Sequence, residues 1–156
     1  MPIARSIRTY LEKHGVKYDV ITHNHTLSSM KTAQAASIPG DQLAKTVILK
    51  DGEGYLMAVL PSTHHLDIDL LNSLLYRDLE LVDETELESL FLDCEPGALP
   101  PVGPAYDMQA IMDSFLSGLA DVYFEAGDHR ELIHVSGKAF RLLQEKSGRG
   151  RIGYHI

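Results

Sequence analysis

The sequence predicts a single compact domain of the mixed α/β (α+β-like) class, with helices surrounding a mixed sheet. The chain has 156 residues, of which 44% are apolar, and this suits one domain with a full core. Helix-like and strand-like segments are interleaved early in the chain, whereas strand-like segments cluster late. Neither a G-x-G-x-x-G nor a Walker A sequence occurs, so the common nucleotide-binding folds lose support.

The N-terminal part predicts two helices separated by a strand. Residues 3–14 place apolar side chains on one face of a helix. Residues 18–22 are β-branched and alternate weakly, which favours a strand. Ser28 or Ser29 then caps a short helix that ends at Pro39-Gly40, and residues 41–44 add one further helical turn.

Two apolar runs predict the middle of the sheet. Residues 46–49 and 55–60 have strand length, and the turn residues 51–54 join them as a hairpin. Their near-continuous apolarity indicates that both faces of each strand are buried. Beyond them, Asp67 caps a leucine-rich helix, residues 79–82 form a short strand, and Asp83 caps another helix.

The last third of the chain predicts a shaped loop, three strands and a helix. Residues 94–106 contain four prolines and two glycines, which favour a loop of fixed shape. Strands follow at residues 108–112, 122–125 and 132–135, and Ser136 caps the final helix. We expect a domain over residues 1–146 and a basic, mobile tail over 147–156.

The net charge of −8 is distributed unevenly. Residues 1–50 carry +4, residues 51–125 carry −15, and residues 126–156 carry +3. The acidic middle would repel a polyanion, although the two basic ends could meet one if the fold brings them together.

Composition excludes several classes of protein. A single cysteine excludes an intramolecular disulfide framework and any cysteine-based zinc cage. The chain contains no apolar run of transmembrane length, and its first ten residues lack the apolar core of a secretory signal. We therefore expect a cytoplasmic protein without membrane contact.

Two features could form a catalytic site. Lys45 stands at the start of a buried strand, where its ammonium would point toward converging loops and an anionic ligand could use it. The segment 94–101 could present backbone N–H groups as an oxyanion hole, because Gly97 lets the backbone approach a ligand. The alternatives are a surface lysine and a rigid connector, with Cys94 a small buried side chain.

Two histidine pairs could bind a metal ion. His23 and His25 have strand spacing, and His64-His65 precede two carboxylates, Asp67 and Asp69. Helix capping already explains Asp67, and Asp69 suits the first helical turn. The first pair has no identifiable partner carboxylate, so the sequence favours no metal at either place.

Several segments together resemble a known family. They are His23, Ala44-Lys45-Thr46-Val47-Ile48-Leu49, Tyr55 to Pro61 with Leu66-Asp67, Gly97-Ala98-Leu99-Pro100-Pro101, Met112-Asp113, Phe124-Glu125-Ala126-Gly127 and Val135-Ser136. In this order and spacing they resemble the YbaK / prolyl-tRNA synthetase-associated editing domain family. The resemblance covers residues 23–143 and implies a curved, partly barrel-like mixed sheet.

The resemblance also implies an activity. Members of this family are mostly aminoacyl-tRNA deacylases that act in trans or within prolyl-tRNA synthetase, without metal or organic cofactor. The family's lysine matches Lys45, its glycine–proline loop matches residues 97–101, and its upstream histidine matches His23, with His25 as the alternative. The family often has a proline soon after that histidine, and Asn24-His25 stands here instead.

We therefore expect trans-editing of a mischarged tRNA. Lys45 would hold the terminal adenosine or its phosphate, and the N–H groups of Gly97 and Ala98 would stabilise the oxyanion. The side chains and backbone expected to line the substrate site are His23, Ser28, Met30, Pro100 and Gly127. The partners would be the tRNA acceptor end and an aminoacyl-tRNA synthetase or other protein. The alternative is a non-catalytic module that binds a tRNA end, a nucleotide or a protein, in a signalling role for example.

Overall fold

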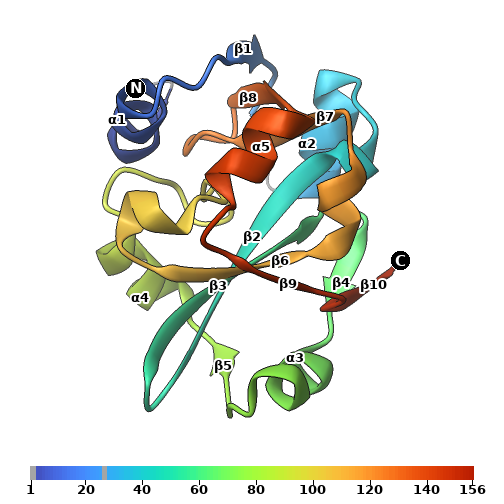
Figure 1. Ribbon diagram of the computed structural model, residues 1–156. Coiled ribbons are helices and arrows are strands. Elements are labelled where there is room, and N and C mark those ends of the chain that lie inside the picture. Colours follow the sequence, from blue (N-terminus) through green and yellow to red (C-terminus); the bar gives the residue numbers. More distant parts are fainter. Residues whose placement is uncertain (1–2, 26–27) are drawn as a thin grey trace.

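The computed structural model describes residues 3–25 and 28–156 as one mixed α/β domain (Figure 1). Within these residues the α-helices are α1 (Arg5–Lys13), α2 (Ser29–Ala36), α3 (Ile68–Leu75), α4 (Glu84–Leu90) and α5 (Gly137–Leu143). The strands are β1 (Asp19–Thr22), β2 (Leu43–Asp51), β3 (Gly54–Pro61), β4 (His64–Leu66), β5 (Glu80–Leu81), β6 (Gln109–Asp113), β7 (Asp121–Glu125), β8 (Glu131–Ser136), β9 (Gly148–Gly150) and β10 (Gly153–His155). Three short 3₁₀ helices complete the fold: η1 (Gly40–Gln42), η2 (Gly103–Tyr106) and η3 (Ser114–Gly118).

The main sheet is mixed, which confirms the predicted class. Its strand order is β1-β8-β7-β2-β3-β6-β9, and β5 adds a short pairing to β2. The pairs β2–β7, β3–β6 and β6–β9 are parallel, and the remaining pairs are antiparallel. Within the described residues the order runs as an open path, so the curved sheet does not close into a barrel.

The β2–β3 hairpin lies in the middle of the sheet, as its apolar sequence predicts. Its register is continuous from the pair Ala44–Pro61 to the pair Asp51–Gly54. In Figure 1 the hairpin is the long ribbon, turquoise in β2 and green in β3, whose turn projects at the lower left. Alternate residues of β2 enter different cores: Ala44 and Ile48 pack with α1, α5 and the loop that follows α4, whereas Leu49 packs with α3.

The predicted helix caps are confirmed. The side chains of Ser28, Asp67, Asp83 and Ser136 accept hydrogen bonds from backbone N–H groups of the first turns of α2, α3, α4 and α5. The expected helical turn at residues 41–44 is instead the 3₁₀ helix η1, because Leu43 and Ala44 already pair within the sheet.

Residues 147–156, which we expect to form a mobile tail, contain two strands that pair with the rest of the domain. Strand β9 pairs with β6, and β10 pairs with β4 (Figure 1). Between the two strands the Ile152 side chain is fully buried, and its N–H donates to the buried carboxylate of Asp113. The burial of Ile152 and the backbone hydrogen bonds of the two strands favour the ordered segment, and they offset the conformational entropy that its glycines lose.

The packing of α5 gives a prediction for stability. Phe140 is fully buried against Phe124, with ring centroids 6.2 Å apart. We expect Phe140→Ala to lower the free energy of unfolding by about 3–5 kcal/mol, because it leaves a cavity in a close-packed core. Urea denaturation measures the change. The control is Leu142→Ala on the same helix, whose side chain is 58% exposed and whose loss should cost less than about 0.5 kcal/mol.

Candidate active site

The parallel pairing of β2 and β7 is short, because β7 ends at Glu125. Leu43 lies opposite Tyr123 and Ala44 opposite Phe124, and no further pair joins these two strands among the described residues. We call the region beyond the Ala44–Phe124 pair the β2–β7 opening. Lys45 and Glu125 are the next residues on the two strands, so their side chains leave the sheet on the same face.

Lys45 is held beside this opening with its ammonium partly withdrawn from water. Its Nζ donates a hydrogen bond to the backbone oxygen of His64. Burial lowers the pKa of Lys45 below the usual lysine value, because desolvation disfavours the charged form. A partly desolvated ammonium interacts more strongly with an anionic ligand than one in bulk water does.

The glycine–proline loop is anchored to Thr46, the residue that follows Lys45 in β2. The Thr46 hydroxyl donates to the backbone oxygen of Leu99 at 2.8 Å. The Leu99 side chain is buried in the core on that face of the sheet, and Pro100 is buried as well. Pro100 was expected to contact substrate. Because Pro100 is buried, we assign it to the packing that supports the loop.

The structure distinguishes the two predicted oxyanion donors. The N–H of Ala98 donates to the Glu95 oxygen at 3.1 Å and closes a turn, and the Ala98 side chain is fully buried. Ala98 is therefore not available as a donor in this conformation. Gly97 is exposed, with φ of 84°, and its N–H has no hydrogen-bond partner in residues 3–25 and 28–156.

A buried cluster of two histidines and one carboxylate lies beside the loop. The Glu125 carboxylate is 3.6 Å from His23 Nε2 and 2.5 Å from His129 Nδ1, and all three residues are buried. The His129 contact is the shorter of the two, so Glu125 interacts mainly with His129. Of these three residues, His23 was predicted as a site residue, Glu125 appeared only within the family-like segment of residues 124–127, and His129 was not predicted.

His129 connects this cluster to the loop. Its Nε2 lies 3.1 Å from the backbone oxygen of Pro96. The Glu125 carboxylate raises the pKa of His129 above the usual histidine value, against the effect of burial. A Cβ atom added at Gly97 would come within 3.2 Å of His129 Nε2, so a side chain at Gly97 would press on this contact.

The other predicted substrate residues lie in different places. Ser28 caps α2, and Met30 on the same helix is 44% exposed, with its sulfur 3.6 Å from where a Cβ of Gly40 would lie. Gly127 has φ of 111° and packs its backbone against Asp93 and Ala4, so it permits a close approach.

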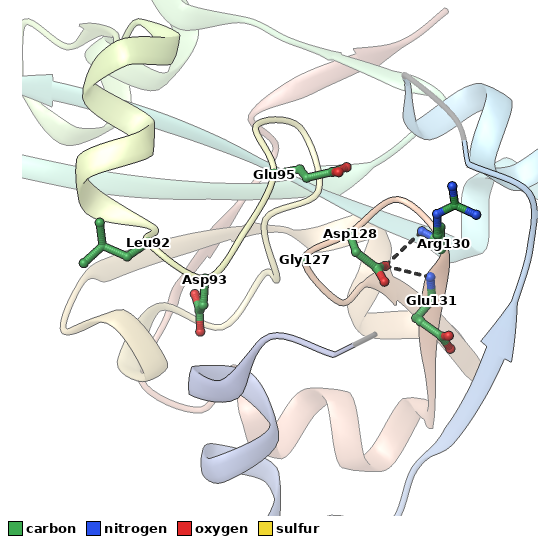
Figure 2. A pocket seen from close by; sticks show the side chains of 7 residues that line it. All are labelled: Leu92, Asp93, Glu95, Gly127, Asp128, Arg130 and Glu131. Carbon is green, nitrogen blue, oxygen red and sulfur yellow. Dashed lines mark hydrogen bonds between the residues drawn. The ribbon is translucent and has the colours of Figure 1, made fainter. Parts of the chain in front are cut away.

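Gly127 also lines a cavity of about 540 Å³ between two loops (Figure 2). The lining residues are Leu92, Asp93, Glu95, Gly127, Asp128, Arg130 and Glu131. Asp128 turns its carboxylate to the backbone N–H groups of Arg130 and Glu131, as the dashed lines in Figure 2 show. Four carboxylates and one guanidinium make this cavity acidic, which is unfavourable for a phosphate.

The two histidine pairs do not converge on one metal site. His23 contacts Glu125, whereas His25 contacts a different carboxylate, Glu95, at 3.0 Å. His64 is buried and its neighbour His65 is exposed. Across residues 3–25 and 28–156, no group of three or more potential ligands is arranged to hold a metal ion.

A profile of the aminoacyl-tRNA editing domain family matches residues 23–143. The chain belongs to this family. Among curated proteins, this editing domain is 26% identical over 131 residues to a proline–tRNA ligase of Trichlorobacter lovleyi and 29% identical over 126 residues to one of Exiguobacterium sibiricum. These matches cover 81% and 78% of the chain but 22% and 21% of the ligases, so the chain spans about a fifth of their length.

Solved structures share the fold of this editing domain. One, described as a candidate trans-editing enzyme for prolyl tRNA synthetase, has a TM-score of 0.84 at 23% identity and covers 99% of this chain and 98% of that one. A candidate signal transduction protein from Marinobacter aquaeolei has a TM-score of 0.75 at 20% identity over 95% of this chain and 30% of that one. No helix in the described part of the chain is long and apolar enough to cross a bilayer.

The environment of Cys94 gives a prediction for thiol reactivity. Burial raises the pKa of Cys94 to about 12, and Tyr106 and Asp93 lie next to the sulfur. Since the thiolate is the reactive form, we expect iodoacetamide to alkylate Cys94 at pH 8 more than 100-fold more slowly than a free thiol. Mass spectrometry over time measures the rate, and 8 M urea should restore it. Fast alkylation of the folded protein would contradict the assignment of Cys94 as a half-buried structural side chain.

The His129–Glu125 contact predicts a pH-dependent stability. Because the pKa of His129 is raised on folding, the contact stabilises the protein fully below about pH 6.5 and loses this effect as the pH rises through the raised pKa. We expect wild type to exceed His129→Gln in free energy of unfolding by more at pH 6 than at pH 9. Urea denaturation at both pH values measures this difference between wild type and His129→Gln. A difference that is equal at both pH values, or larger at pH 9, would contradict a stabilising His129–Glu125 contact.

Proposed function

We propose that this editing domain hydrolyses the ester bond of a mischarged aminoacyl-tRNA, acting in trans. The observation that carries the proposal is the partly desolvated Lys45 at the start of β2, together with the exposed Gly97 on a loop that the neighbouring residue Thr46 anchors through Leu99. Membership of the aminoacyl-tRNA editing domain family over residues 23–143 supports the same substrate class.

The chemistry needs little from the protein because an aminoacyl ester is already activated. Water attacks the carbonyl carbon, the carbonyl oxygen becomes an oxyanion, and the ester C–O bond then breaks and releases the ribose oxygen with a proton. The main requirements are to position the water and to stabilise the oxyanion. In the proposed mechanism Gly97 supplies a backbone N–H to the oxyanion, and a group of the substrate, such as a ribose hydroxyl, accepts the proton from water.

Lys45 supplies positive charge to the same site. Its ammonium holds the phosphate of the terminal adenosine and raises the positive potential near the ester. The His64 oxygen that accepts from Nζ fixes the ammonium in place, so the charge is organised before the substrate binds.

The cluster of His23, Glu125 and His129 acts in this proposal through the loop. His129 supports the Pro96 oxygen one residue before Gly97, and Glu125 holds the imidazole. The three residues are buried, which suits a positioning role better than direct contact with the ester. A rigid loop keeps the Gly97 N–H aligned with the position of the oxyanion.

The charge distribution suggests how the substrate is delivered. With a net charge of −8 the protein attracts a polyanion weakly, so contact is confined to the acceptor end. The curated relatives are proline–tRNA ligases that are several times longer. We propose that a synthetase of this kind, or another protein, presents the mischarged tRNA to this domain.

A panel of mischarged tRNAs tests the activity. Proline tRNA charged with alanine or cysteine and threonine tRNA charged with serine are incubated with the protein, and released amino acid is measured. Release shows a deacylase. Binding without release would instead support the alternative of a non-catalytic module, for which the likeness to a signal transduction protein shows only a shared fold.

The role of Lys45 gives a prediction for activity. On the tRNA that the panel identifies, we expect Lys45→Ala to slow single-turnover hydrolysis by roughly 100-fold, because a preorganised positive charge is lost. The matched control is Lys50→Ala in the same strand, whose ammonium pairs with Glu86 at 2.6 Å, and it should retain the wild-type rate. An unchanged rate for Lys45→Ala would exclude this role for Lys45.

A further inference from the structure

A second cavity lies beside Lys45 and is built largely from the C-terminal segment. It has a volume of about 420 Å³. Its lining residues are His64, Asp113, Ser114, Phe115, Arg151, Gly153, Tyr154 and His155. Strands β4 and β10, which carry part of this lining, run side by side close to the C-terminus (Figure 1). The family match ends at residue 143, so half of this lining lies outside it.

Aromatic rings surround the cavity. The His64 ring lies 5.3 Å from the Phe115 ring and 5.2 Å from the His155 ring, measured between centroids. Phe115 is 42% exposed and Tyr154 is 51% exposed, although large aromatic side chains are usually buried. Rings exposed around one cavity provide flat surfaces on which a planar ligand can stack.

The cavity also carries a cation without a partner. Arg151 is exposed, and no carboxylate forms an ion pair with it within residues 3–25 and 28–156. The carboxylate in the lining, Asp113, is buried and accepts hydrogen bonds from the N–H groups of Phe115 and Ile152. Asp113 thus holds the two walls of the cavity together, and the guanidinium of Arg151 remains free for a ligand anion.

The cavity is connected to the proposed catalytic lysine through His64. The Lys45 ammonium bonds to the backbone oxygen of His64, whose imidazole lines the cavity. Asp41 accepts from Thr63 and lies 3.2 Å from His155 Nε2, and the N–H of Ile156 donates to the Thr63 oxygen. These contacts fix the C-terminal strand beside the start of β2.

We propose that this cavity binds the single-stranded 3′ end of the tRNA. A base stacks on Phe115 and the neighbouring imidazoles, and Arg151 pairs with a backbone phosphate. This inference rests on the proposed function and extends it, because it assigns the binding of the acceptor end to residues outside the family match. A nucleic acid strand fits better than an acidic peptide, since stacking surfaces and one cation match a base and its phosphate.

Binding of uncharged RNA tests the proposal. The probe is a fluorescein-labelled single-stranded octanucleotide ending in CCA-3′, and the readout is anisotropy between 50 and 200 mM salt. We expect Arg151→Ala to weaken binding and to reduce the slope of log K against log salt by about 0.7, the value for one phosphate contact on a single strand. Arg149→Ala is the matched control, because Arg149 lies two residues away and outside the lining, and it should keep the wild-type slope.

The stacking part is tested with Phe115→Leu, which keeps apolar bulk but removes the ring. We expect binding about fivefold weaker or worse, with an unchanged salt slope. Equal effects of Arg151→Ala and Arg149→Ala, or wild-type affinity in both Arg151→Ala and Phe115→Leu, would overturn the proposal. Displacement of the probe by AMP at concentrations as low as those of unlabelled octanucleotide would also overturn it, because the ligand would then be a free mononucleotide.

The two proposals fail separately. The octanucleotide contains no ester, so its binding is measured whether or not the protein hydrolyses aminoacyl-tRNA. Hydrolysis in the tRNA panel together with binding that is insensitive to Arg151 and Phe115 would reject the cavity and leave the deacylase proposal standing. Binding that depends on these residues, with no hydrolysis in the tRNA panel, would reject the deacylase proposal and leave the cavity proposal standing.

Discussion

The early end of the β2–β7 pairing determines where the other parts of the site lie. After the Ala44–Phe124 pair the two strands no longer exchange hydrogen bonds, and the loop that contains Gly97 is fixed beside the opening. The register places Lys45 and Glu125 on one face of the sheet at this opening. Because β7 ends at Glu125, β2 continues beyond this point without β7 beside it, and Thr46 of this segment anchors the loop through Leu99.

Local signals in the sequence predicted much of the fold. Caps such as Asp67 and Ser136 are recognisable because a side chain bonds to a backbone N–H only two or three residues away. The β2–β3 hairpin is recognisable because both strands are apolar throughout and a short turn joins them. Lys45 and Gly97 were singled out from the residues themselves and again through the resemblance to a family, and in the structure the Thr46–Leu99 hydrogen bond joins the two segments that contain them.

Features that depend on contacts distant in sequence were missed. Glu125 is separated from His23 by about a hundred residues, and no local pattern marks a buried ion cluster. The pairing of β9 and β10 depends on strands β6 and β4, so a glycine-rich and basic segment gave no strand signal of its own. The N–H of Ala98 is occupied because it closes a turn with the Glu95 oxygen. The sequence does not indicate which backbone N–H groups of the loop are occupied in this way.

The most direct test of the account is a crystal structure with a non-hydrolysable amide analogue of an aminoacylated 3′-terminal adenosine. The account predicts that the analogue binds at the β2–β7 opening, with its carbonyl oxygen within hydrogen-bond distance of the Gly97 N–H and its phosphate on the Lys45 face of the sheet. An analogue bound in the acidic cavity that Gly127 lines, away from Lys45, would contradict the account.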